Sequence, residues 1–431
     1  MSIIGVEAVE AAAGGILNLR RGDRLTPLAR DRAAELEVRI VEAAAAPPSS
    51  SLSSSQAGTA APAADTGLPR PVDLHSRGAL VSPPSPALFR RGAPFPGLRG
   101  RPRPDPATAR RPRNPGRGRA GRVTIVGAGN VGTHAAMRLA ETDLVDEIVL
   151  VDVVEGLAKG VALDLTHASG LLGFDTTVRG EASVDAAGRA DYTIITAGRP
   201  RQPGMSRTDL TATNAAIVEP TAAAAGRVSP QGVIVVVTNP LDEMTELAWA
   251  ASGLPSSRVI GMAGLLDSAR FQAIAGIAAA VRPDAVEVLA LGSHGDEMVI
   301  PVSTAAVDGG SAASVLQSSL AAVVDRTRDS GAEVVALLGK GSAFITPGLA
   351  AARMVEYMLR GRSPVISATV RPDGQYGLRD VYVGLPVRLG RRGVDEIVQV
   401  DLAADEVVAL RAAAEEIRAR VAALPAPAKA G

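Results

Sequence analysis

The chain has 431 residues, which exceeds what one compact core usually holds and predicts two or more domains. Its 45 basic residues balance its 45 acidic residues, so global charge gives no reason to expect a nucleic acid or an anionic membrane as a partner. The absence of cysteine excludes disulfides, thiolate catalysis and cysteine-ligated zinc, and four scattered histidines predict no metal site.

Residues 1–45 are predicted to form a short helical element. Its first apolar residues recur at near-helical spacing: Ile3, Ile4, Val6, Val9, Ile16 and Leu17. The segment RLTPLARDRAAELEVRIVEA, residues 24–43, is a second helical candidate. RLTPLARDRAAELEVRI resembles a short segment of enzymes of bacterial microcompartments, where terminal extensions bind the shell or cargo. This resemblance implies a protein partner for residues 1–45; an accessory helix and a misassigned start codon are the alternatives.

The start of the chain does not predict export or membrane insertion. Glu7 and Glu10 interrupt the stretch where an export signal would be uniformly apolar. No apolar run reaches the roughly 18 residues that a membrane span needs. We therefore expect a cytoplasmic protein.

Residues 46–120 are predicted to be a disordered linker. Fifteen of the 30 prolines lie between Pro47 and Gly121, together with the run SSSLSSS, and apolar residues show no regular spacing. Such a segment buries too little surface to offset its ordering entropy. Residues 101–122 carry eight arginines and one acid, Asp105, and one interpretation of this pattern is contact with RNA or an acidic surface. Without interleaved aromatic residues, a solvated linker is favoured and no nucleic acid is expected.

From Gly121 onward the sequence has the pattern of a dinucleotide-binding domain. The apolar run RVTIV leads into GAGNVG and then into the helical stretch THAAMRLAET. Gly127 allows a tight turn, Gly129 lets the backbone approach a pyrophosphate, and Gly132 lets the helix pack on the strand. The helix start offers free N–H groups to the phosphates. The predicted phosphate loop is Gly127, Ala128, Gly129, Asn130, Val131 and Gly132.

An acid follows at the spacing that this motif requires. The run EIVLVD ends in Asp152, twenty residues after Gly132, where a carboxylate accepts hydrogen bonds from the adenosine ribose. Its charge would repel a 2′-phosphate, which favours NAD over NADP. The runs YTIITAG and GVIVVVTNP continue the alternation of strands and helices that is typical of a parallel sheet.

Cationic residues follow these strand ends. Ligands of parallel sheets collect beyond the carboxyl ends of the strands, where Gly198, Arg201, Arg207 and Asn239 all lie. Guanidinium groups match carboxylates bidentately, and histidine exchanges protons near neutral pH. Arg201 and Arg207, together with the downstream Arg270 and His294, therefore predict a pocket that binds a small dicarboxylate and exchanges a proton with it.

Six motifs in order identify a family. GAGNVG, ITAGRPRQPGMSR, VVTNPLDEMT, RVIGMAGLLDSARF, GSHGDEMVIPVS and GQYGLRDVYVGLPV have the order and spacing of the malate and lactate dehydrogenases. The chain most closely resembles bacterial malate dehydrogenases that are similar to lactate dehydrogenase. The resemblance implies an α/β fold: a Rossmann-type doubly wound parallel sheet over residues 121–265, then a mixed α/β substrate domain over residues 266–431. It also implies NAD as cofactor and a homodimer or homotetramer.

The resemblance also implies the roles of the site residues. His294 would take the proton from the substrate hydroxyl, Asp267 would orient and stabilise its imidazole, and Arg270 would clamp the carboxylate beside the reacting carbon. Asp267 and Arg270 are three residues apart on a predicted helix, so they share one face. Arg207 would polarise the reacting carbonyl.

Arg201 is the residue that favours malate over lactate. Lactate dehydrogenases usually carry glutamine at this loop position, so Arg201 implies a second substrate carboxylate. Asn239 would bind the substrate. The residues expected to line the nicotinamide side are Asn214, Val237, Thr238 and Asn239.

Two residues depart from the family pattern, and two alternatives remain. Ser293 stands where relatives mostly have glycine, and Gln202 replaces a lysine that is common in the loop. The expected reaction is oxidation of malate by NAD to oxaloacetate and NADH. The alternatives are a lactate-type 2-hydroxyacid dehydrogenase, and a scaffold protein in which the N-terminal element dominates.

Overall fold

The computed structural model describes residues 120–200, 206–339 and 341–424, together with short stretches and single residues between residues 3 and 42. The chain divides into two units, residues 1–102 and residues 103–431. The predicted linker over residues 46–120 lies outside the described residues except for Ala120, which begins strand β5.

The described part of the first unit contains short strands in two parallel pairs. β1 (Ile3–Ile4) pairs with β3 (Arg24–Leu25). β2 (Ile16–Leu19) pairs with β4 (Arg39–Glu42). These strands replace much of the helical element that the apolar spacing predicted.

The prediction of helix is therefore wrong for Ile3, Ile4, Ile16 and Leu17, and for both ends of the segment 24–43. Isoleucine is β-branched and favours strands, and over short runs apolar spacing does not distinguish a strand from a helix. Pairing with a distant strand then decides the conformation. Helical conformation does occur at two buried residues of this unit, Val9 and Ala33.

The second unit is built on a large sheet whose first half is parallel. Its parallel strands lie in the order β7-β6-β5-β8-β9-β10. They are β5 (Ala120–Val126), β6 (Val145–Val151), β7 (Thr177–Glu181), β8 (Tyr192–Ile195), β9 (Val233–Val236) and β10 (Val259–Gly261). This is the doubly wound order of a dinucleotide-binding domain, and it confirms the predicted fold class.

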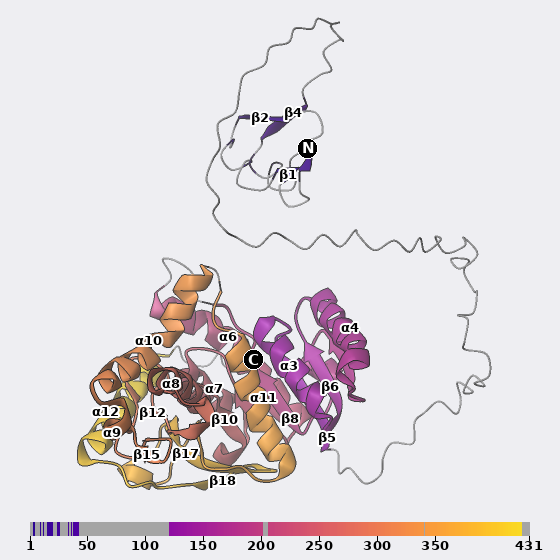
Figure 1. Ribbon diagram of the computed structural model, residues 1–431. Coiled ribbons are helices and arrows are strands. Elements are labelled where there is room, and N and C mark those ends of the chain that lie inside the picture. The colour runs from indigo at the N-terminus through magenta and orange to yellow at the C-terminus, as the bar shows by residue number, and fades with distance from the viewer. Residues whose placement is uncertain are drawn as a thin grey trace, which may run out of the picture. The chain divides into compact units, whose positions relative to one another are not determined.

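Helices cover both faces of this parallel half (Figure 1). The helices on one face are α3 (Asn130–Thr142), α4 (Glu155–Leu172) and α11 (Ile345–Arg360). Those on the other are α5 (Val184–Ala187), α6 (Arg207–Val228) and α7 (Leu241–Ser252). Valine and isoleucine fill the strands because both faces are buried. Gly348 allows α11 to approach α3 closely, because a Cβ there would lie 2.7 Å from the Val131 carbonyl oxygen.

The sheet continues beyond β10 as antiparallel strands. β16 (Ile366–Val370) pairs with β10 and with β17 (Val383–Gly390). The remaining strands of the sheet are β12 (Leu291–Gly292), β13 (Met298–Val299) and β18 (Gly393–Ile397). The change from parallel to antiparallel pairing marks the mixed α/β part of the chain that the sequence predicted.

A third core supports this C-terminal part. α8 (Gly264–Ala279) packs with α10 (Leu320–Leu338), and Phe271 and Val323 are buried between them. The small sheet beside them consists of β11 (Val286–Glu287), β14 (Ala306–Val307) and β15 (Gly310–Ser311), followed by α9 (Ala312–Leu316). The last helix, α12 (Ala404–Ala422), lies against β12 and α7. In the described parts of the chain, no helix combines the length and apolar character that spanning a membrane requires.

Candidate active site

The loop after β5 leaves room for a phosphate group. Gly127 has φ +104°, and a Cβ there would lie 2.8 Å from the Ala197 nitrogen. A Cβ on Gly132 would lie 1.9 Å from the Gly127 oxygen, whereas one on Gly129 would meet no atom within 4 Å. Two of these glycines therefore permit the tight packing, and the third leaves open space. No side chain caps the start of α3, which leaves N–H groups of its first turn without a side-chain acceptor.

Asp152 lies directly after β6, beside this loop. Its Oδ2 accepts a hydrogen bond from the Ala128 nitrogen at 2.9 Å, and its Oδ1 accepts one from the Val154 nitrogen at 3.0 Å. Each carboxylate oxygen can accept more than one hydrogen bond. The carboxylate is thus held in place and can still accept hydrogen bonds from ribose hydroxyls, so these residues fit NAD.

Asn214 joins the loops after β8 and β9. Its Nδ2 donates to the Asn239 oxygen at 2.7 Å and to the Arg199 oxygen at 3.1 Å, while its Oδ1 accepts from the Arg199 nitrogen at 2.8 Å. The buried amide is thus bound to the backbone of both loops and fixes them relative to each other.

The neighbouring residues differ in exposure. The Thr238 hydroxyl is buried and donates to the Ala197 oxygen at 2.8 Å. Val237 is half-buried, while the Asn239 side chain is exposed. Asn239 is therefore the residue of this group whose side chain is exposed at the carboxyl edge of the sheet.

His294 and Asp267 meet although 27 residues separate them. His294 follows β12, and its Nδ1 lies 2.8 Å from Oδ2 of Asp267 on α8. Because an ionised carboxylate only accepts hydrogen bonds, Nδ1 carries the hydrogen and Nε2 is left to exchange a proton. Arg270 donates to Oδ1 of Asp267 at 3.0 Å, so one buried carboxylate holds both the imidazole and the guanidinium.

The surroundings of His294 favour its charged form. Burial lowers the pKa of His294, but the charge and hydrogen bond of Asp267 raise it more, so the net pKa lies above its ordinary value. Arg270 opposes this increase, and Asp242 adds to it. The imidazole is therefore suited to accept a proton and to hold it as a stabilised imidazolium.

Of the two remaining predicted arginines, the structure describes only the backbone of Arg207. Arg201 lies outside the described residues. Arg207 is the first residue of α6, and its side chain is outside the described part of the chain. Ser206 caps this helix: its hydroxyl accepts from the Asp209 nitrogen at 3.0 Å, and Asp209 in turn accepts from the Ser206 nitrogen. The cap fixes where α6 begins and hence where the Arg207 backbone lies.

Sequence reasoning missed a polar cluster behind His294. The buried Asp242 accepts hydrogen bonds from the His294 nitrogen and from the Ser293 hydroxyl, and Arg420 donates to the same hydroxyl. The sequence held one signal, the acid pair in NPLDE at the predicted start of a helix. Nothing local indicated that Arg420 would reach it.

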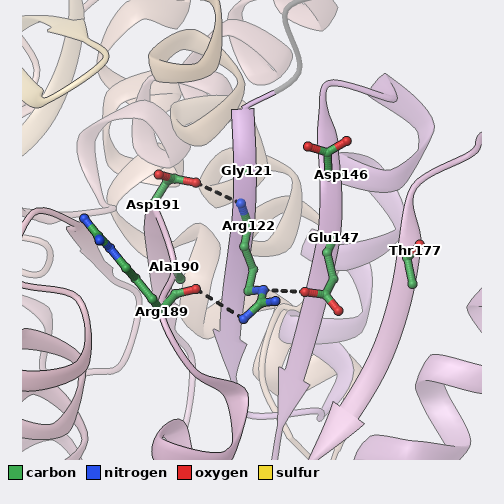
Figure 2. A pocket seen from close by; sticks show the side chains of 8 residues that line it. All are labelled: Gly121, Arg122, Asp146, Glu147, Thr177, Arg189, Ala190 and Asp191. Carbon is green, nitrogen blue, oxygen red and sulfur yellow. Dashed lines mark hydrogen bonds and ion pairs between the residues drawn. The ribbon is translucent and has the colours of Figure 1, made fainter. Parts of the chain in front are cut away.

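A polar hollow lies at the opposite edge of the sheet, where β5 and β6 begin (Figure 2). Arg122 crosses it and pairs with Glu147, while the Arg122 nitrogen donates to Asp191 at 2.8 Å. These charges stabilise one another across neighbouring strands. The hollow is remote from the carboxyl edge, and we assign it no ligand.

Models of two domains of one protein family match this chain from residue 121 to residue 425. The model described as lactate/malate dehydrogenase, NAD binding domain, matches residues 121–261, and the model of the α/β C-terminal domain matches residues 265–425. The chain belongs to the lactate/malate dehydrogenase family. It is therefore an NAD-dependent oxidoreductase, as the motifs predicted.

Individual relatives agree with this assignment. The malate dehydrogenase of Synechocystis sp. is 45% identical over 285 residues, covering 66% of this chain and 88% of the relative. That of Thermomicrobium roseum is 46% identical over 286 residues, covering 66% and 92%.

Solved structures of the family have the same fold. The malate dehydrogenase of Salinibacter ruber has a TM-score of 0.67 and 39% identity, covering 70% of this chain and 96% of that one. The lactate dehydrogenase of Cryptosporidium parvum, solved with lactic acid and NAD, has a TM-score of 0.67 and 31% identity, covering 70% and 98%.

Proposed function

We propose that this family member is an NAD-dependent malate dehydrogenase that reversibly oxidises (S)-malate to oxaloacetate. The observation that carries the proposal is that His294 and Arg270 both contact the same buried carboxylate, that of Asp267. Asp267 and Arg270 lie on α8, and this carboxylate therefore holds the proton acceptor, His294, beside a carboxylate-binding group. Relatives that are 41–46% identical and are named malate dehydrogenase support it.

His294 acts as the proton acceptor during oxidation. Nε2 takes the proton of the malate hydroxyl, and Asp267 stabilises the imidazolium that forms. The loop at Gly129 and the carboxylate of Asp152 would hold NAD, which would supply the hydride acceptor for the carbon that carries this hydroxyl. In the reverse direction the imidazolium returns its proton to the oxaloacetate carbonyl oxygen.

Three arginines hold the substrate in this proposal. Arg270 uses one N–H group on Asp267 and retains others for the carboxylate beside the reacting carbon. Arg207 polarises the carbonyl, and Arg201 pairs with the second carboxylate. A substrate with a methyl group in that place would leave the charge of Arg201 without a partner.

The test compares oxaloacetate and pyruvate as substrates for NADH oxidation by the full chain. We expect a higher kcat/KM for oxaloacetate, and Arg201→Gln should lower it by about 10²–10³-fold, since loss of one partner of a charge pair costs about 2–5 kcal/mol. Turnover of pyruvate should fall much less. A wild-type preference for pyruvate would instead assign the protein to the lactate-type enzymes. Full activity of His294→Asn would contradict the mechanism.

Two further expectations stay predictions. One is that the chain forms a homodimer or homotetramer. The other is that residues 1–45 bind a protein partner, with association to a bacterial microcompartment as the form that the sequence resemblance implies.

A further inference from the structure

A second buried carboxylate contacts His294 at its backbone, whereas Asp267 contacts its ring. Asp242 is the second residue of α7 and is 2% exposed. Its Oδ2 accepts from the Ser293 hydroxyl at 2.9 Å and from the His294 backbone nitrogen at 3.1 Å. Its Oδ1 lies 3.2 Å from the hydroxyl of Thr369 on β16. Three donors from two other elements thus converge on one acid.

Arg420 connects this carboxylate to the last helix of the fold. Arg420 lies in the final turn of α12, and its guanidinium donates a hydrogen bond of 2.8 Å to the Ser293 hydroxyl oxygen. It also pairs with Glu243 at 2.8 Å and with Glu297 at 3.2 Å. The Ser293 hydroxyl therefore gives its single hydrogen to Asp242 and accepts one from Arg420, so this hydroxyl connects α7 to α12.

We propose that Asp242, Ser293 and Arg420 form a support that positions His294 for proton exchange. Asp267 holds the ring through Nδ1, whereas this support holds the peptide group of the same residue. Two fixed points on one residue define where Nε2 lies. The inference rests on the proposed role of His294 as proton acceptor and adds positioning residues that do not themselves contact the substrate.

The chemistry of the cluster suits a positioning role. Burial and the neighbouring Glu243 raise the pKa of Asp242 to about 6, while the His294 and Ser293 hydrogen bonds oppose this rise. Near neutral pH the carboxylate is ionised, and a charged acceptor forms stronger hydrogen bonds than a neutral one. The charged groups that act on Asp242 are Glu243, His294 and Arg420, and Arg420 pairs in turn with Glu297.

The support should affect the rate more than binding. Displacement of a catalytic group by about 1 Å can lower the rate by about 100-fold without removing any contact to the substrate. Ser293 is 4% exposed and its hydroxyl is used within the protein, so its loss should leave the malate and NAD contacts intact. A change in kcat with little change in KM is therefore the expected signature.

The experiment measures steady-state malate oxidation for Ser293→Ala and Arg420→Met in the full chain. We expect kcat to fall by about 10–100-fold and KM for malate and NAD to change by less than about threefold. Arg418→Met is the matched control, because Arg418 lies on the same helix and contacts the exposed Glu415 and the Arg379 backbone oxygen, neither of which belongs to the cluster. Its kcat should equal that of the wild type. Arg420→Lys, which keeps the charge and a single donor nitrogen, should recover part of the rate.

A double-mutant cycle separates positioning from a general structural role. If Ser293 acts through the imidazole, Ser293→Ala should not lower the residual rate of His294→Asn any further. An equal fold-loss in both backgrounds would overturn the inference, as would a wild-type kcat for Ser293→Ala. An increase in melting temperature on addition of NADH shows that a variant is folded. Where Ser293→Ala or Arg420→Met does not fold, Asp242→Asn is measured in its place. Because its amide oxygen can still accept from Ser293 and His294, Asp242→Asn should retain more activity than Arg420→Met, and the reverse order would also overturn the inference.

These results distinguish the inference from the proposed function. If the wild-type protein oxidises NADH with neither oxaloacetate nor pyruvate, the proposed function fails. If the wild type is active and both Ser293→Ala and Arg420→Met match its kcat, only the positioning role fails.

Discussion

Replacement of Asp267 by asparagine tests the central contact of the site. The side chain is 2% exposed, and its two oxygens accept from different donors, His294 Nδ1 and an Arg270 N–H group. Asparagine has nearly the same shape but only one accepting oxygen. If that oxygen faces His294, the amide NH₂ group opposes the guanidinium of Arg270. If it faces Arg270, the NH₂ group opposes Nδ1–H and drives the imidazole hydrogen to Nε2, where the proton acceptor is needed.

The expected loss follows from the charge that disappears. Asp267 Oδ2 lies 2.8 Å from His294 Nδ1. An opposite charge this close shifts a pKa by about 1–3 units, and each unit corresponds to about 1.4 kcal/mol. Loss of Asp267 should therefore destabilise the imidazolium by about 1.4–4 kcal/mol. Since general base catalysis contributes about 10²–10⁴-fold, we expect kcat for malate oxidation to fall by about 10²–10³-fold.

The pH profile gives the sign of the effect. Oxidation needs the neutral imidazole, so the wild-type rate falls as pH decreases through the raised pKa of His294. Without Asp267, burial is left as the main influence and lowers this pKa, so the acidic limb of the variant should move to lower pH. For reduction of oxaloacetate, which needs the imidazolium, the variant should lose its rate at a lower pH than the wild type.

The assay follows NADH formation from malate, and NADH consumption with oxaloacetate, across the pH range. Asp284→Asn is a suitable control, because Asp284 is exposed and pairs with Arg282 outside the site. The reasoning would be refuted if kcat of Asp267→Asn lay within about threefold of the wild-type kcat, or if the acidic limb of its pH profile lay at the same pH as that of the wild type.

Three other predictions concern separate parts of the molecule. Burial raises the pKa of Asp242 from 3.8 to about 6, so its ionisation lowers the stability of the folded protein as pH rises through this interval. Asp242→Asn should therefore be up to about 3 kcal/mol more stable than the wild type at neutral pH, as measured by denaturant unfolding. A variant that is less stable than the wild type at neutral pH would contradict this. Asp152→Ser should raise KM for NAD by about 10–100-fold and raise the NADP to NAD activity ratio, and an unchanged ratio would exclude a ribose contact. A chain that begins at Ala120, the first residue of β5, should keep the kcat of the full protein, and loss of that activity would show that the preceding residues support the enzyme.

Local patterns predicted the parts of the site that depend on short stretches of chain. The glycine spacing of GAGNVG predicted the turn into α3, where Gly132 fits under the Gly127 oxygen. Helical periodicity placed Asp267 and Arg270 on one face of α8, and the two are hydrogen-bonded. Both results follow from geometry within a few residues, because a turn or a helix repeats the same backbone angles whatever the rest of the chain does.

Local pattern was insufficient in the N-terminal unit. The spacing of Ile3, Ile4 and Ile16 matched a helix, yet these residues lie in strands that pair with residues 24–25 and 39–42. A strand has no hydrogen bonds of its own, so its stability depends on a partner elsewhere in the chain. The same spacing of apolar residues can therefore serve either structure until that partner is known.

By itself, then, the sequence determined the family, the doubly wound sheet with its nucleotide loop, and the residue types that a diacid and a proton require. The family resemblance also implied the contact of Asp267 with His294, but only the tertiary structure showed that Asp242, Ser293 and Arg420 meet behind it. His294 meets Asp267 across 27 residues, and Ser293 meets Asp242 across 51 and Arg420 across 127. The physical reason is that the order of the strands brings α7, α8 and the end of α12 to one place, and no regularity within any single segment encodes that convergence.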